Sequence, residues 1–450
     1  MTIGSAQLHA QDAALHKSLS ITMQDAVRSG LATNPEYGTV AASRRATDEE
    51  LNQGEALFLP SIDFAGDFGF EHSDDPATRA GPGDDEEDLF RSEAGLTLTQ
   101  LLFDGFESKF EVLRQKARVN SAAHRVRETS ELVGLAIVQS YLEVMRQRQL
   151  LVIARQNVAD HLSILEQVED GVNAGRTTQA DLEQVRARVA AAKATESNTR
   201  QALRNAEATY IEEVGDEAGQ LTMPVIPYDA LAAGVDEEVE KVLSYSPTLD
   251  IFASDIEVAY AEAIQTRSTQ YPQVDFQVNG RVGNDINGVE GVDRSASALV
   301  VVNWNLYRGG GDIARAREFL HRHQQAKEAR TEAARAVTNE VRQSWAAMIA
   351  AGEQAREFAS QAEANVEVVK AYKDQFTLDR RTLLDVLDAQ NELFVSRSNA
   401  INSEFLEMFA VYQILALKGS LLPTLGLEYP RESVLASDET WDHDRKMEAR

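Results

Sequence analysis

The chain has 450 residues, with 7% aromatic residues, 10 prolines and no cysteine. Its formal net charge of −28 argues against a nucleic-acid partner, because phosphate backbones bind clusters of Lys and Arg. The lack of cysteine excludes disulfides, thiolate metal sites and a catalytic thiol, and it argues against a lipid anchor on an N-terminal cysteine. The low aromatic content, together with tracts rich in Ala, Gln, Glu and Arg, favours long helices over a compact core.

The start of the chain lacks the charged stretch and the apolar run of a secretory signal. We therefore expect residues 1–19 to form a disordered N-terminus, in which Leu8-His9-Ala10 is compatible with the end of a removed signal. From Ser20 to Phe58 the apolar residues follow a helical period, with a break at Asn34-Pro35.

After Pro60 the apolar period changes from that of a helix to that of a strand. Residues 61–72 and 91–103 each alternate apolar and polar side chains, so each is predicted to be a strand with one apolar face. Between them lies a loop that ends in the acidic run 84–88. The longest apolar run of the chain, 298–302, is far shorter than the ~18 residues of a membrane-spanning helix, so a membrane role would rest on strands.

A long helix is expected over residues 105–172, which contain no proline, and a second helix over 179–214. Apolar residues of the first helix recur at alternating spacings of three and four, as they do in a coiled coil. A turn near Gly175 reverses the chain, so the two helices are predicted to form a hairpin. A linker that contains Gly and Pro is predicted over 216–235.

The same order of elements then repeats, which is the strongest structural signal in the sequence. Leu59-Pro60-Ser61 matches Tyr271-Pro272-Gln273 at an offset of 212 residues, whereas later matches have an offset of 204. Because 212 − 204 = 8, eight additional residues of the first half lie in or beside the acidic loop. The predicted parts are a first repeat over 20–215, a second repeat over 236–422 with strands over 273–284 and 295–307 and helices over 311–376 and 382–418, and a polar, disordered tail over 423–450.

The predicted strands cannot form a closed sheet within one chain. Four strands with one apolar face are too few for a barrel, and an open sheet edge cannot face lipid. A trimer would supply 3 × 4 = 12 strands. We therefore predict a mainly α protein with β-strands, in which internally duplicated coiled-coil hairpins adjoin strands that a trimer would close into a 12-stranded trimeric barrel. The alternative is a soluble coiled-coil scaffold, on which the strands would pack as small ribbons.

The second helical turn carries the main functional candidate. Thr382 and Asp385 form a T-x-x-D capping box, and Asp388 follows at i+3 on the same helix face. The first turn repeats the box with Asp181, but Gln184 stands where the second acid would be. Both capping acids have a structural explanation, whereas Asp388 has no capping role, so Asp388 is the stronger functional candidate.

Several motifs together resemble those of the TolC family of outer-membrane efflux and secretion channels. The motifs are Leu59-Pro60-Ser61 and Tyr271-Pro272-Gln273 where strands begin, Phe103-Asp104-Gly105-Phe106 and Tyr307-Arg308-Gly309-Gly310-Gly311 where strands end, and residues 383–390 after the second turn. The resemblance covers residues 20–422 and implies a homotrimer in outer membrane lipid with a periplasmic α-barrel. It also implies a periplasmic adaptor and an inner-membrane transporter as partners, and a protein or small molecule as cargo. The loop 75–79 is similar to that of the branch that serves type I protein secretion.

The resemblance further implies a pore gate at the periplasmic end. Asp385 and Asp388 match the family's two aspartate rings, and Arg381 matches an arginine that helps to hold the entrance shut. Asp181 matches an acid on the neighbouring helix pair, while a tyrosine of the latch falls at Phe376, which has no hydroxyl to donate. Rings of like charges would select cations, and their repulsion would raise the carboxyl pKa values.

The sequence contains no Ser/His/Asp set, no metal-ligand spacing and no nucleotide-binding motif. We therefore expect a protein that is not an enzyme and that needs no cofactor or metal. A periplasmic adaptor of an efflux pump is a second alternative. An adaptor would have one helical hairpin between β-domains, whereas this sequence predicts two hairpins of matched length.

Overall fold

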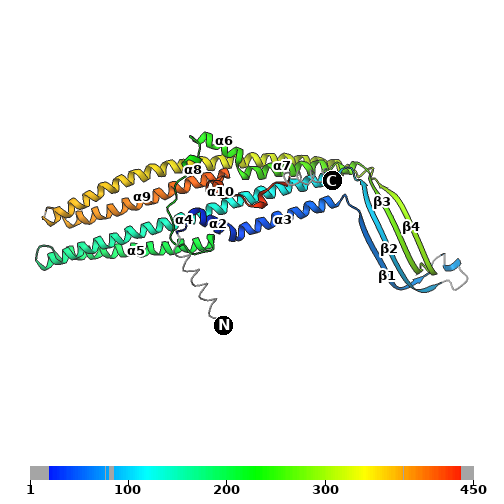
Figure 1. Cartoon of the computed structure of the whole chain (residues 1–450), viewed down its shortest axis with the longest axis horizontal. Helices are drawn as coiled ribbons and strands as arrows, with labels where there is room; N and C mark the ends of the chain where they lie inside the picture. Colours follow the sequence, from blue (N-terminus) through cyan, green and yellow to red (C-terminus); the bar gives the residue numbers. More distant parts are fainter. Residues whose placement is uncertain (1–19, 75, 77, 81–85, 379, 437–450) are drawn as a thin grey trace. The chain divides into compact units, whose positions relative to one another are not determined.

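A computed structural model of the chain describes residues 20–74, 76, 78–80, 86–378 and 380–436 (Figure 1). Its helices and strands follow the predicted order, and none of the helices in these residues combines the length and the apolarity needed to cross a membrane. The elements are α2 (Met23–Thr33), α3 (Pro35–Ala56), β1 (Ser61–Ser73), β2 (Glu87–Phe103), α4 (Glu107–Asn173), α5 (Gln179–Val214), α6 (Val235–Tyr245), α7 (Pro247–Gln265), β3 (Gln273–Ile286), β4 (Val289–Asn303), α8 (Gly311–Thr377), α9 (Leu383–Lys418) and α10 (Leu421–Thr424). The N-terminus predicted to be disordered, part of the acidic loop and the last residues of the tail lie outside the described residues.

The duplication is visible in the lengths of the helices. The long helices α4 and α8 have 67 residues each, and the returning helices α5 and α9 have 36 residues each. The pair α2–α3 recurs as α6–α7, and in both pairs the helix breaks before a proline. Asn34 and Ser246 have extended backbones, with ψ of 124° and 121°, because a following proline ring disfavours the helical conformation.

The strand boundaries differ from the prediction at two places. β2 begins at Glu87 instead of about residue 91, and β4 spans Val289–Asn303 instead of about 295–307. The reason for the second error is a tight turn at Asn287-Gly288, where both residues have positive φ (54° and 70°). Asn-Gly is the preferred pair for such a hairpin turn. β4 therefore starts directly after it and ends sooner than predicted.

The tail is more ordered than predicted. Residues 428–436 are described, and they include a short 3-10 helix at Arg431–Ser433. Tyr37 of α3 donates a hydrogen bond to Glu432 at 3.3 Å, and the side chain of Gln24 donates one to the carbonyl of Gly426 at 3.2 Å. The prediction of a disordered tail is therefore wrong for this stretch.

The chain divides into two compact units, and each takes residues from both predicted repeats. The first unit comprises Met1–Ala42, His124–Asp250 and Glu332–Ser433. Its largest apolar core joins α2, α4, α5, α9 and α10, with Tyr141, Ile414 and Leu421 fully buried. At the far end of the helices, the turn ends of the hairpins α4/α5 and α8/α9 lie side by side (Figure 1).

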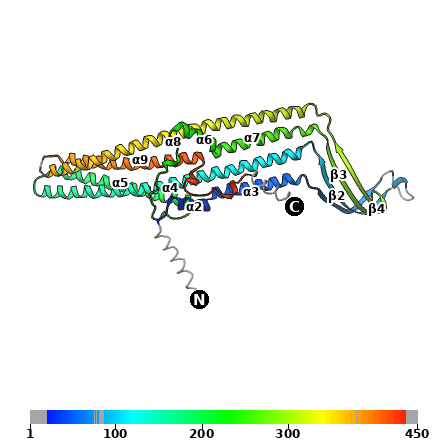
Figure 2. The ribbon, with the colours of Figure 1, turned by 45° about the horizontal axis from the view of Figure 1, so that its top comes forward.

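The second unit comprises Ser43–Ala123, Ile251–Thr331 and Val434–Arg450. Its sheet is antiparallel throughout, in the order β1-β2-β3-β4, so β1 and β4 are its open edges. The helices of this unit lie in the corresponding order α3, α4, α7 and α8 (Figure 2). The contacts between successive helices are the ion pair Arg118–Glu50 at 2.7 Å, the hydrogen bond Gln265–Glu111 at 3.1 Å and the ring contact Tyr260–His323 at 5.6 Å.

The sheet exposes the apolar side chains that define its predicted apolar face. Phe64, Phe68 and Phe70 of β1 are 73%, 82% and 91% exposed, and Val300 of β4 is 62% exposed. Exposed apolar surface on this scale marks a site of protein or membrane contact.

Candidate functional site

The two helical turns have the caps that the sequence predicts. The hydroxyl of Thr382 accepts a hydrogen bond from the backbone N–H of Asp385, and the Asp385 carboxylate accepts one from the backbone N–H of Thr382 at 3.2 Å. Thr178 and Asp181 form the same reciprocal box at the start of α5, at 3.0 Å. Each box satisfies backbone donors that the first helical turn leaves unpaired. The structural role of both acids is therefore confirmed.

The cap also determines the charge state of Asp385. The hydrogen bond from the Thr382 hydroxyl, the bond from the Thr382 backbone and the nearby Arg381 hold the pKa of this carboxyl below its usual value of 3.8. Repulsion within a symmetric ring would act in the opposite sense, because it raises the pKa of a carboxyl. Contacts within a single chain therefore favour the ionised form of the Asp385 carboxyl.

Arg381 makes its contacts within its own hairpin. Its guanidinium lies 4.1 Å from the centre of the Tyr372 ring, and its Nε donates to the side chain of Gln375 at 3.1 Å. The nearest contact to Asp385 is longer, at 3.9 Å. Tyr372 and Gln375 were not predicted as site residues, although each lies within a few positions of Phe376. The turn is therefore braced by a cation–π contact that needs no tyrosine at position 376.

Phe376 itself belongs to an apolar cluster at the turn ends. This turn-end cluster consists of the buried residues Ile164, Val168, Leu182, Val185, Val189, Leu383, Val386 and Leu387. Phe376 packs against it from α8, together with Tyr372. The cluster contains residues of α4, α5 and α9, so apolar packing joins the two hairpins directly behind the caps.

Asp388 pairs with a residue that the sequence analysis missed. Its Oδ1 lies 3.0 Å from an Nη2 atom of Arg188 on α5, and both side chains are about half exposed. Two residues further along α9, the side chain of Gln390 donates a hydrogen bond to Asp160 of α4 at 2.7 Å. Two polar contacts thus tie α9 of the second hairpin to the first hairpin. No local signal marks Arg188, because it lies 200 residues from Asp388.

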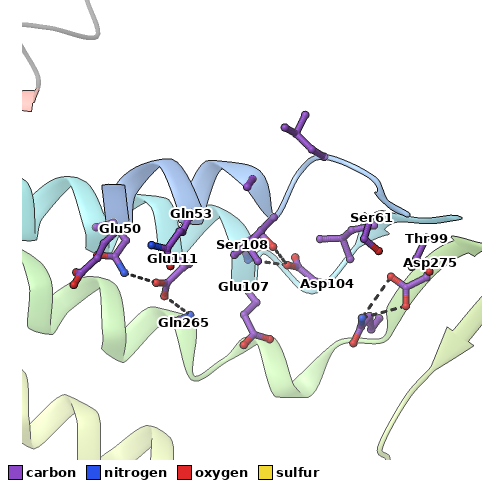
Figure 3. Close-up of a pocket in the computed structure, with 17 residues that line it drawn as sticks. Glu50, Gln53, Ser61, Thr99, Asp104, Glu107, Ser108, Glu111, Gln265 and Asp275 are labelled. Carbon is purple, nitrogen blue, oxygen red and sulfur yellow. Dashed lines mark hydrogen bonds between the residues drawn. The ribbon is translucent and has the colours of Figure 1, made fainter. Parts of the chain in front are cut away.

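In the second unit, a cleft lies where the helices meet the sheet (Figure 3). This cleft of about 830 Å³ is lined by Glu50, Asp104, Glu107, Glu111 and Asp275 among others. Several of its carboxylates already accept hydrogen bonds from neighbouring side chains or backbone, such as Asp104 from the Ser108 N–H at 2.7 Å. The described residues include no group of three or more potential ligands arranged to hold a metal ion.

Comparisons with known proteins agree with this architecture. The sequence profile described as "Outer membrane efflux protein" matches residues 26–212 and 239–405. The outer membrane efflux protein BepC of Brucella suis is 24% identical over 437 residues, which cover 94% of this chain and 92% of the relative. The outer membrane protein TolC of Vibrio cholerae is 24% identical over 401 residues, which cover 86% of this chain and 88% of the relative.

Solved structures show the same fold. A membrane protein from Pseudomonas aeruginosa superposes with a TM-score of 0.80 at 17% identity, covering 92% of each chain. The CmeC outer membrane channel of Campylobacter jejuni superposes with a TM-score of 0.78 at 11% identity, covering 93% of this chain and 88% of that one. The chain therefore belongs to the outer membrane efflux protein family, as its motifs predicted, and is a protein of the Gram-negative outer membrane with its helical part in the periplasm.

Proposed function

We propose that this protein is the outer-membrane exit duct of a tripartite export system, a passive conduit that is gated at its periplasmic end. The observation that carries the proposal is the pairing of two matched helical hairpins with one open sheet whose apolar face is exposed. The relatives that it matches are outer membrane proteins, which supports a duct that catalyses no reaction.

The assembly we propose is a homotrimer. The sheet has two different open edges, β1 and β4, and an interface between two different edges is heterologous, so it closes into a ring when the rotation permits. Three copies would give 3 × 4 = 12 strands and leave no unpaired edge towards the lipid. The exposed phenylalanines of β1 and the exposed valines of β4 would then contact outer membrane lipid.

The gate we propose is formed by the second turn of each chain. Asp385 and Asp388 would lie in two rings around the three-fold axis, with Arg381 and Asp181 beside them. The ion pair Asp388–Arg188 and the packing of Phe376 support a role for this end in holding the hairpins together. The exposed residues at the turns, such as Leu378 at 64%, would meet a periplasmic adaptor and, through it, an inner-membrane transporter that delivers the protein or small-molecule cargo.

Single-channel conductance in planar bilayers tests the proposal. The wild-type protein is expected to form cation-selective pores that a trivalent cation blocks from the side of the helical turns. At ~6 Å and an effective dielectric of ~20, each carboxylate attracts a unit positive charge by about 3 kcal/mol, so Asp388→Ala should weaken the block at least tenfold.

Arg188→Ala is the matched control, because it breaks the same ion pair and leaves the Asp388 carboxylate in place. This variant should keep or strengthen the block. Equal block in wild type and in Asp388→Ala would remove Asp388 from the gate, and a protein that forms no pores would overturn the duct itself.

A further inference from the structure

Three buried polar side chains lie on α4 and α9, one helix from each hairpin of the first unit. Asn157 and His161 lie one helical turn apart on α4, and Gln390 lies on α9; they are 8%, 4% and 2% exposed. Asn157 Oδ1, His161 Nδ1 and Gln390 Oε1 each lack a hydrogen-bond partner among the described residues. We name these three residues the polar layer.

The position of His161 on α4 would suit an apolar residue. Val158 precedes it and Ile164 and Val168 follow it on the buried face of the helix, and the last two belong to the turn-end cluster. A buried polar group without a partner destabilises a folded protein by about 1–3 kcal/mol. The polar layer therefore destabilises the packing of α4 and α9 next to the turn-end cluster.

The charges around His161 disfavour its protonation. Burial lowers the pKa of this imidazole below its usual value of 6.5, and Arg188 of α5 and Lys373 of α8 lower it further, while Asp160 of α4 opposes them. On α9, the neutral Gln390 is bonded to Asp160, and the carboxylate of Asp388 is bonded to Arg188.

The direction of the pH effect follows from these neighbours. A histidine whose folded pKa lies below its unfolded value contributes its full packing energy above about pH 6.5. That contribution is lost as the pH falls from about 6.5 through the folded pKa. Over this range His161 binds a proton more readily when the hairpins are separated than when they are packed, so acid favours the separated state.

We propose that the polar layer is a proton-operated release between the two hairpins, in which a proton on His161 adds a third positive charge beside Arg188 and Lys373 and separates α4 from α8 and α9 at the turn end. In the duct proposed above, on which this consequence rests, the separation opens the periplasmic entrance in acid. The helical part of the protein is in the periplasm, so its histidines meet periplasmic pH.

A distance measurement between spin labels tests the release without any reading of channel activity. Since the chain has no cysteine, Ala180→Cys on α5 and Leu384→Cys on α9 give one exposed label on each hairpin. Labelled chains are mixed with an excess of unlabelled chains in detergent. The label-to-label distance should shift to longer values as the pH falls from 7.5 to 5.5, with a midpoint below 6.5.

The titrating residue is identified by substitution. His161→Leu, which fills the apolar position, and His161→Gln, which keeps a polar but uncharged side chain, should both abolish the shift. His323→Leu is the control, because His323 is a partly buried histidine in the second unit, and it should leave the shift unchanged. A distance that does not change with pH in the parent protein, or that still changes in both His161 variants, overturns the proposal. If the protein formed no pores, the proposal of an exit duct would be wrong, whereas the proposed release between the hairpins would still be tested by the label distances.

Discussion

Asp385 and Asp388 lie one turn apart on α9, yet their partners within the chain differ. Asp385 is held by the N-terminal cap of its helix, whereas Asp388 reaches across to Arg188 on the other hairpin. An exposed ion pair contributes about 1 kcal/mol or less to stability, so the Asp388 pair acts as a contact between hairpins more than as a source of stability.

The cap leads to a prediction on stability. Asp385→Ala should lower the melting temperature at pH 7, because the backbone N–H and the hydroxyl of Thr382 lose the carboxylate that accepts their hydrogen bonds. The hydrogen bond from Thr382 holds the pKa of Asp385 below 3.8, so the stabilisation is present above that value and is lost as the pH falls through the folded pKa. The difference from wild type, followed by circular dichroism, should therefore vanish in strong acid.

Asp181→Ala serves as the matched control, since it removes the equivalent box at the other turn. It should lower the melting temperature by a similar amount, whereas Asp388→Ala should change it little. A larger loss in Asp388→Ala than in Asp385→Ala would contradict this assignment of roles.

Glu131 of α4 is a buried carboxylate in the first unit. It is 1% exposed and accepts hydrogen bonds from the backbone N–H groups of Leu421 at 2.9 Å and Leu422 at 3.4 Å. The Tyr429 hydroxyl donates to it at 2.9 Å, and the guanidinium of Arg127 lies 4.7 Å from the Tyr429 ring centre. This arrangement fastens the chain after α9 to α4, and it explains why the tail is ordered here.

The pH dependence of this contact is opposite to that of Asp385. Burial raises the pKa of Glu131 from 4.5 to about 7. The contribution to stability is therefore complete below about pH 4.5 and is lost as the pH rises through about 7, by up to about 3 kcal/mol. Glu131→Gln cannot ionise, so its unfolding free energy should lack this decline between pH 5 and 8. An identical decline in the variant, measured by denaturant titration, would assign the effect to another group.

At the scale of elements, the two hairpins have arms of equal length. Their turn ends share one apolar cluster, which contains side chains from α4, α5 and α9. Such a cluster can form only if both turns reach the same level. This packing therefore requires helices of matched length, and the long helices α4 and α8 have 67 residues each while the returning helices α5 and α9 have 36 each.

This leads to a prediction on helix length. Adding one heptad to each arm of the second hairpin moves its turn by about 10 Å, which takes Val386 and Leu387 out of the cluster. The melting temperature should fall and the Asp388–Arg188 pair should be lost. Adding the same heptads to both hairpins should restore the melting temperature. If the single and the double insertion melt alike, the turn-end cluster contributes little.

At the scale of the whole molecule, a single chain leaves two strand edges without a partner and an apolar sheet face uncovered. The sheet has free edges at β1 and β4, and its phenylalanines and valines are exposed. Open edges and large apolar faces are conditions that soluble monomers avoid. The homotrimer proposed above removes both.

Crosslinking checks this. In mild detergent, the protein should give a three-chain species that retains helical and strand signals in circular dichroism. Phe68→Asp and Phe70→Asp place charge on the most exposed positions of the apolar face and should reduce recovery in the membrane fraction. A stable monomer in detergent-free buffer with the same secondary structure would contradict the trimer.

The sequence by itself determined the order of the elements and the lengths of the long helices. Helix and strand periods are local properties, and an internal repeat doubles every local signal, so α5 and α9 could be bounded to within a residue. The caps at Thr178 and Thr382 followed from a spacing of three residues. The Asn287-Gly288 turn, which sets the start of β4, is equally visible in the sequence, because Asn-Gly is the preferred pair of a tight hairpin turn.

Only the tertiary structure decided which residues meet across the two repeats. The partners Asp388–Arg188, Gln390–Asp160 and Glu131–Leu421 are separated by 200 or more residues, and no local pattern encodes such a contact. The same holds for His161, whose place on an apolar face is visible in the sequence but whose cationic neighbours come from α5 and α8. Periodicity determines which face of a helix is buried, whereas packing between helices determines which charges that face will meet.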